Sequence, residues 1–132
     1  MEITRIQPAG LVVSPAFSHV AVVPAGADTV YVGGQNGVDD QGALVSDDVA
    51  EQSVRAVENA KVALEAAGAS IADVVQWTVL IHVDADLNAA YGAVAPLMSG
   101  PGEPPLVTAA RVAGFGVPGA LIEVSAIAAR MA

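Results

Sequence analysis

The sequence predicts an α+β fold in which two helices cover one face of one mixed β-sheet. Two segments repeat apolar residues at helical spacing, and six shorter segments are rich in apolar and β-branched residues. Glycine and proline separate these segments, and no linker, repeat or low-complexity tract divides the chain. The 132 residues are therefore expected to form one domain, residues 1–132, with the element order β-β-β-α-β-α-β-β.

Three short strands are predicted before the first helix. They are expected at Ile3 to Ile6, Val20 to Val23 and Thr29 to Val32. The β-branched and aromatic residues of the third segment favour a strand, and Gly33-Gly34 is expected to end it. The segment from Asp39 to Gly42 is typical of a turn.

The first helix is predicted from Asp48 to Gly68. Asp48 and Glu51 have the spacing of a capping box, in which a side chain at the helix start accepts a hydrogen bond from the helix backbone. Apolar residues that include Val57 and Leu64 recur on one face of this segment. Gly68 is a natural helix stop.

The second half of the chain is expected to hold a central strand, a second helix and two final strands. Residues Val74 to Val83 place apolar groups on both faces, as a strand covered on two sides requires. Asp86 is expected to cap the second helix, which should kink or end near Pro96 because proline donates no backbone hydrogen bond. A proline-rich loop, Gly100 to Pro105, then leads to strands at Leu106 to Ala113 and Ala120 to Ala128.

The composition argues against several classes of function. The net charge is −9, and five Lys and Arg residues cannot build the basic surface that nucleic-acid phosphates require. The absence of cysteine excludes disulfides and thiolate chemistry. No leader pattern or long apolar run is present, so we expect a cytoplasmic protein with no membrane partner.

The balance of apolar and charged residues bears on assembly. Hydrophobic residues make up 54% of the chain and charged residues only 14%. Such a composition suggests that oligomerisation buries further surface, although the many alanines and valines would also fit an ordinary core.

The glycine-rich segment Gly33-Gly34-Gln35-Asn36-Gly37 is the first candidate site. It lacks the spacing of a phosphate-binding loop, so it is either a tight turn or a place where substrate approaches the backbone closely. The two histidines, His19 and His82, have no further histidine or carboxylate at metal-ligand spacing. No metal site is expected.

Glu123 and Arg111 are the next candidates. A glutamate in an apolar strand is able to position or deprotonate water if it faces a cleft, whereas at a solvated sheet edge it has no such role. Strand alternation places Val107, Ala109 and Arg111 on one face, with Arg111 roughly 13 Å beyond Val107. An ion pair with a carboxylate is the expected role of Arg111, and contact with a ligand is the alternative.

Several segments carry a resemblance in their order and spacing. They are Tyr31 to Gln35, Glu51-Gln52, Val57 to Lys61, Leu64 to Ser70, Asp73 to Val75, Thr78 to Ile81, Pro104 to Arg111 and Ile122 to Val124. In this arrangement the chain resembles the RidA or YjgF family of reactive intermediate deaminases, from about Ser14 to Ala129. The resemblance implies a chorismate-mutase-like fold, a homotrimer without a cofactor, and a small metabolite bound in clefts between subunits.

The resemblance also implies roles for particular residues. Glu123 matches a glutamate that holds the attacking water, and it is the expected catalytic residue. Val107 stands where catalytic members carry an arginine that binds the substrate carboxylate through a two-pronged contact. The expected substrate-binding residues are Phe17, Gly33, Gly34, Gln35, Val107 and Ala109.

Four of these positions depart from the family pattern. Phe17 replaces a tyrosine, Gly33 a serine, Val107 the arginine and Ala109 a cysteine. These replacements predict a more apolar pocket that does not favour anionic imino acids such as 2-iminobutanoate. The sequence thus predicts a hydrolase of an imine, an enamine or a related neutral metabolite, and the alternative is a non-catalytic trimeric module that binds a small ligand or a partner.

Overall fold

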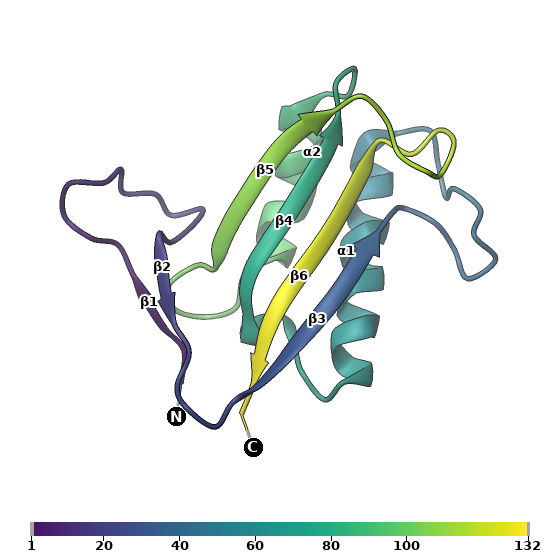
Figure 1. The fold of residues 1–132 in the computed structure, drawn as a ribbon. Coiled ribbons are helices and arrows are strands. Elements are labelled where there is room, and N and C mark those ends of the chain that lie inside the picture. Colours follow the sequence, from purple (N-terminus) through teal and green to yellow (C-terminus); the bar gives the residue numbers. More distant parts are fainter. Residues whose placement is uncertain (1, 132) are drawn as a thin grey trace.

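Four strands form a mixed sheet, and two helices lie behind it on one face (Figure 1). The computed structural model describes residues 2–131. The strands follow in the spatial order β3 (Asp28–Gln35), β6 (Ile122–Arg130), β4 (Val74–His82) and β5 (Leu106–Val112). Only β4 and β5 run parallel to each other. With the helices α1 (Val49–Ala66) and α2 (Leu87–Val94), the arrangement confirms the predicted fold class and element order.

The first two strands lie apart from this sheet. β1 (Thr4–Ile6) and β2 (Val20–Val22) pair with each other in a hairpin beside the start of β5 (Figure 1). Ser18 holds the hairpin in place, because its backbone N–H donates to the carbonyl of Pro105 and its hydroxyl donates to that of Pro104. Arg5 adds hydrogen bonds to two carbonyls near the start of β4. The mixed sheet therefore contains four of the six strands.

Both helices begin and end for the reasons that the sequence indicates. The carboxylates of Asp48 and Asp86 each accept a hydrogen bond from a backbone N–H in the first turn of α1 and α2. The chain leaves α1 through Gly68, whose φ of 74° is a conformation that glycine adopts without strain. The second helix ends at Val94, and a short 3₁₀ turn that contains Pro96 follows it.

The core lies between the helices and the sheet. Every second side chain of β4 faces the helices, and Trp77, Val79 and Ile81 are buried there. The opposite face of β4 is half-buried rather than fully covered in the single protomer. Tyr31 on β3 is 76% exposed, so this second face, which we call the open face, offers surface to a partner.

Gly33 and Gly34 form a bulge and do not end the third strand, which corrects the sequence-based prediction. Val32 pairs with Ala126 and Gln35 with Val124, so the two glycines stand opposite one residue of β6. The strand continues to Gln35. Such an extra residue bends the strand and changes which way the following side chains point.

A second 3₁₀ turn, Ile71–Asp73, precedes β4.

Between residues 2 and 131, no helix has the length and apolar character needed to cross a bilayer.

Candidate functional site

Glu123 lies on the open face of the sheet, directly against the glycine bulge. It is the second residue of β6 and pairs with Leu80 of β4, whose side chain points away from the helices. A Cβ atom added to Gly34 would lie 2.6 Å from Cδ and 2.9 Å from Oε2 of Glu123. Only a glycine lets the carboxylate lie this close to the backbone of β3. The half-buried carboxylate therefore lies against the backbone of β3, on the open face of the sheet.

Other side chains on the open face surround Glu123 with neutral groups. Leu80 stands opposite it, and Ser125 is the next residue of β6 on the same face. Thr78 pairs with Ser125, and Thr108 of β5 pairs with Thr78. The site therefore combines one carboxylate, an apolar side chain and a row of hydroxyl groups. The sequence-based analysis did not identify these neighbours. Identifying them requires both the alternation of side chains along β6 and the pairing of β4 with β5 and β6.

Phe17 occupies the loop of the β1–β2 hairpin, at the start of β5. Its carbonyl accepts a hydrogen bond from Gln7 Nε2, and its ring meets the ring of His19 edge-on with centroids 5.4 Å apart. The neighbouring Ser18 is bonded to the carbonyls of Pro104 and Pro105. Phe17 thus lies near the end of β5 that carries Val107.

Val107 and Glu123 lie on opposite faces of the sheet within one protomer. Val107 pairs in parallel register with Trp77, and its side chain packs against the core. Trp77 and Leu80 are three residues apart on β4, which corresponds to about 10 Å along the strand. Ala109 pairs with Val79 and so faces the same side as Val107, at the exposed margin of the sheet. One protomer therefore does not bring these predicted site residues together.

Arg111 contacts backbone carbonyls rather than a carboxylate, which corrects the ion pair expected from the sequence. Its Nη1 donates to the carbonyls of Val83 and Ala85, at 3.1 and 3.2 Å. Arg111 pairs with Ile81, so it shares the helix-facing side with Val107, as the alternation predicts. The guanidinium fastens the turn between β4 and α2. It does not lie on the face of Glu123.

Gln35 also lies away from Glu123. Beyond the bulge it pairs with Val124, a fully buried residue under the helices. It lines a surface hollow with Asn59 and Val62 of α1, and its Nε2 donates to the carbonyl of Gly33. Gly33 itself is exposed, with open space where a side chain would begin. Of the glycine segment, Gly34 makes the direct approach to Glu123.

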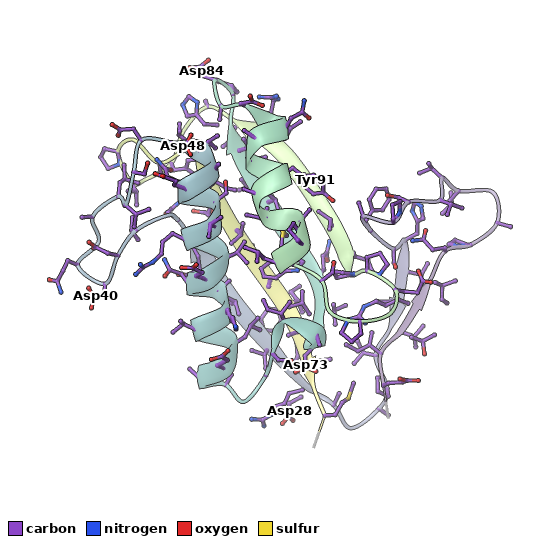
Figure 2. All side chains as sticks on the ribbon, turned by 180° about the vertical axis from the view of Figure 1, so that it is seen from behind. Asp28, Asp40, Asp48, Asp73, Asp84 and Tyr91 are labelled. Carbon is purple, nitrogen blue, oxygen red and sulfur yellow. The ribbon has the colours of Figure 1, made fainter. Side chains whose placement is uncertain are left out.

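The two histidines make local contacts. His82 Nδ1 accepts a hydrogen bond from the backbone N–H of Asp84, as expected for a residue at the end of a strand. His19 Nε2 lies 2.6 Å from the carbonyl of Val12. Within residues 2–131, no three His, Asp or Glu side chains are grouped as metal ligands. Figure 2 shows Asp28, Asp40, Asp48, Asp73 and Asp84 spread around the rim of the molecule.

Gln52 positions the start of β6 from inside the core. This fully buried side chain of α1 accepts a hydrogen bond from the N–H of Leu121 and donates to the carbonyls of Ser46 and Gly119. Leu121 is two residues before Glu123. The amide therefore ties the glutamate-bearing end of β6 to the first helix.

The substitution Gln52→Ala is expected to lower the free energy of unfolding by about 1–3 kcal/mol, because it leaves three partly buried backbone groups without their hydrogen-bond partner. Urea unfolding at fixed protein concentration measures the loss. The exposed Gln41 provides a control, since its replacement by alanine removes no such bonds. Equal losses for both variants would show that Gln52 has no special role.

The two-helix layer, the mixed sheet and a glutamate held beside a glycine bulge define a protein of the RidA or YjgF class. A family model described as Endoribonuclease L-PSP matches residues 10–130. The chain belongs to this family.

Individual relatives agree with this assignment. The chain is similar to the crystal structure of the Rid-family protein YyfB from Yersinia pestis, a protein of unknown function, with a TM-score of 0.85 and 27% identity over 98% of this chain and 99% of that one. It is similar to TdcF of E. coli with bound serine, with a TM-score of 0.67 and 28% identity over 83% and 85%. A RutC family protein of Pyrococcus abyssi is 45% identical over 60 residues, which span 45% of each chain.

Proposed function

We propose that this protein hydrolyses an imine, an enamine or a related neutral small metabolite, with Glu123 positioning the attacking water. The observation that carries the proposal is the close contact of the Glu123 carboxylate with the backbone at Gly34 on the open face. A half-buried carboxylate on a partly exposed face of the sheet suits general acid–base catalysis. The resemblance of the chain to reactive intermediate deaminases, with Glu123 at the position of their water-holding glutamate, is further support for this chemistry.

The site supports a short sequence of steps. The substrate lies on Leu80 with its C=N group above Glu123, while the hydroxyls of Ser125 and Thr78 are placed to hold polar groups. Glu123 accepts a proton from water as the water oxygen attacks the carbon. The same carboxyl then returns this proton to nitrogen, which gives a carbinolamine. As the C–N bond breaks, the carbinolamine hydroxyl proton passes through the Glu123 carboxylate to nitrogen, so that ammonia leaves and the carbonyl product remains. Water is the only co-reactant, so the reaction needs no cofactor.

A neighbouring subunit is expected to complete the cleft. In one protomer Glu123 lies on an exposed sheet face with the apolar side chains of Tyr31, Leu80 and Ile127. Covering this face would exclude water around the reacting group and strengthen the action of the carboxylate. We propose a cytoplasmic homotrimer in which Phe17 of one subunit approaches the open face of another.

The experiment is ammonia release from freshly generated imines and enamines, including 2-aminoacrylate and 2-iminobutanoate, with the assembled protein. We expect acceleration over buffer for at least one C=N compound and little for these two anionic substrates. Light scattering after size exclusion establishes the assembly used. If a folded trimer accelerates none of a panel of neutral and charged imines, the hydrolase proposal fails.

A non-catalytic ligand-binding trimer is the second candidate. Its support is the position of Val107, which packs against the core where catalytic relatives are expected to carry a substrate-binding arginine. A ligand that binds only the folded state raises the melting temperature. Thermal stabilisation by a metabolite that is recovered unchanged would favour this function over hydrolysis.

A further inference from the structure

All five Lys and Arg side chains already contact groups away from Glu123. Arg5 donates hydrogen bonds to the carbonyls of Ala72 and Val74, and Arg111 donates to those of Val83 and Ala85. Arg130 donates to the carbonyl of Ala67 and to the carboxylate of Asp28. On α1, Arg55 donates to the side-chain oxygen of Asn59, and Lys61 Nζ lies 4.0 Å from the carboxylate of Glu65. These five are the only Lys and Arg residues in the sequence. None of these contacts involves Glu123.

The fold also keeps these cations off the face of Glu123. Arg55 and Lys61 belong to α1, which covers the opposite face of the sheet (Figure 2). Arg111 shares its side of the sheet with the buried Ile81. Arg5 belongs to β1, and its guanidinium contacts the start of β4. Arg130 is the last residue of β6. A second copy of this chain brings the same five side chains with the same contacts.

His82 is the remaining basic side chain near Glu123. It lies on the same face, two residues beyond Leu80 on β4, and its backbone N–H donates to the carbonyl of Leu121. Its Nδ1 accepts a hydrogen bond from the Asp84 N–H, and the Asp84 carboxylate lies 3.9 Å from the same nitrogen. The contacts of this ring nitrogen are therefore with Asp84, in the turn after β4, and not with Glu123.

We infer that the open-face site takes iminium ions that carry no carboxylate, in preference to 2-imino acids. The inference rests on the proposed hydrolase function and names its substrate class. A ligand carboxylate beside Glu123 would meet a like charge with no Lys or Arg counter-ion, and the net charge of −9 opposes its approach. An iminium ion is attracted by both the carboxylate and the overall charge.

The chemistry of an iminium ion suits a site with one acid–base group. Water attacks the carbon of R₂C=NH₂⁺, the C=N electron pair moves to nitrogen, and Glu123 accepts the proton that water loses. Glu123 then returns this proton to nitrogen, the C–N bond breaks, and the hydroxyl proton leaves as the carbonyl forms. The products are R₂C=O and NH₄⁺. Because the substrate arrives with its nitrogen protonated, no second acid is needed to start the reaction.

The reaction that supplies such a substrate follows from its structure. An iminium ion without a carboxylate forms when a primary amine loses two electrons and two protons to an oxidase or dehydrogenase and the resulting imine gains a proton. A 2-imino acid forms in the same way from an amino acid. The inference therefore places this protein after amine oxidation.

A matched pair of substrates tests the inference. Phenethylamine and L-phenylalanine differ only by the carboxylate, and a flavin amine oxidase or amino acid oxidase converts each into its imine. With the oxidase in excess, hydrolysis of the C=N bond limits ammonia release. We expect the wild-type protein to accelerate hydrolysis of the phenethylamine-derived imine at least tenfold more than that of the imino acid, and Glu123→Gln to remove the acceleration.

The outcomes separate the two proposals. Faster hydrolysis of the imino acid would overturn the substrate class and leave the hydrolase function standing. No acceleration of either substrate by a folded assembly would overturn both. As a second test, Leu80→Lys places a cation opposite Glu123, and it should lower the preference for the amine-derived imine at least tenfold relative to the neutral variant Leu80→Gln. An unchanged preference would count against the charge argument.

Discussion

Replacing Trp77 with alanine is expected to lower the free energy of unfolding by about 3–5 kcal/mol. The indole is fully buried between the helices and the sheet, so its removal leaves a cavity that the core fills only in part. Its Nε1 also donates a 2.9 Å hydrogen bond to the carbonyl of Met98, which would lose its partner. Chemical denaturation at a fixed protein concentration measures the change, since assembly makes apparent stability depend on concentration.

The variant Trp77→Phe separates these two contributions. Phenylalanine keeps an aromatic ring in the core but has no N–H to donate to Met98. We expect it to cost about 1–3 kcal/mol, less than alanine. A loss below about 1 kcal/mol for Trp77→Ala would contradict the description of this residue as a fully buried part of the core.

Replacing Gly34 with alanine is expected to reduce hydrolysis on the order of 10²-fold, because small displacements of a catalytic group carry large kinetic costs. The new Cβ would lie 2.6 Å from Cδ of Glu123, closer than any real contact permits. The carboxylate must therefore move away from its place beside the bulge. Initial rates of ammonia release, compared at equal protein folding and assembly, measure the effect.

The adjacent glycine supplies the matched control. A Cβ on Gly33 would meet no heavy atom within 4 Å, so Gly33→Ala should keep the position of Glu123 and most of the activity. Equal loss of activity in both variants would show that the bulge as a whole matters and that the contact between Gly34 and Glu123 does not. If Gly34→Ala kept full activity, the close contact between Gly34 and the Glu123 carboxylate would not be needed for hydrolysis.

Local signals in the sequence predicted the helices well. Asp48 and Asp86 accept backbone hydrogen bonds where each helix begins, and Pro96 follows the end of α2. These features depend on residues within one or two turns, which a sequence displays directly. The bulge at Gly33-Gly34 was missed because its geometry is set by the pairing of β3 with β6, almost a hundred residues later.

The arrangement of the site depends on strand register, which the sequence alone does not give. Alternation correctly grouped Val107, Ala109 and Arg111 on one face, yet only the pairing of β4 with β5 and β6 shows that Glu123 lies on the other. The bulge likewise turns Gln35 toward α1. The position of the β1–β2 hairpin depends on the hydrogen bonds of Ser18 with Pro104 and Pro105, which are far from it in the sequence. No local sequence pattern predicts these hydrogen bonds.

Charge placement explains how a family fold can carry an altered specificity. Val107 is partly buried against the core, and the five Lys and Arg side chains contact carbonyls, an amide and carboxylates away from Glu123. None of these five cations contacts Glu123. We therefore expect the scaffold that places the glutamate beside Gly34 to select against anionic substrates.

The most direct measurement of the central claim compares wild-type protein with Glu123→Gln on the best imine substrate, at matched folding and oligomeric state. Glutamine preserves the size of the side chain and its contact with Gly34 but accepts no proton from water. We expect ammonia release above the buffer rate to fall at least about 10²-fold, the usual contribution of a general acid–base group. An unchanged rate in Glu123→Gln would contradict the assignment of Glu123 as the residue that activates water.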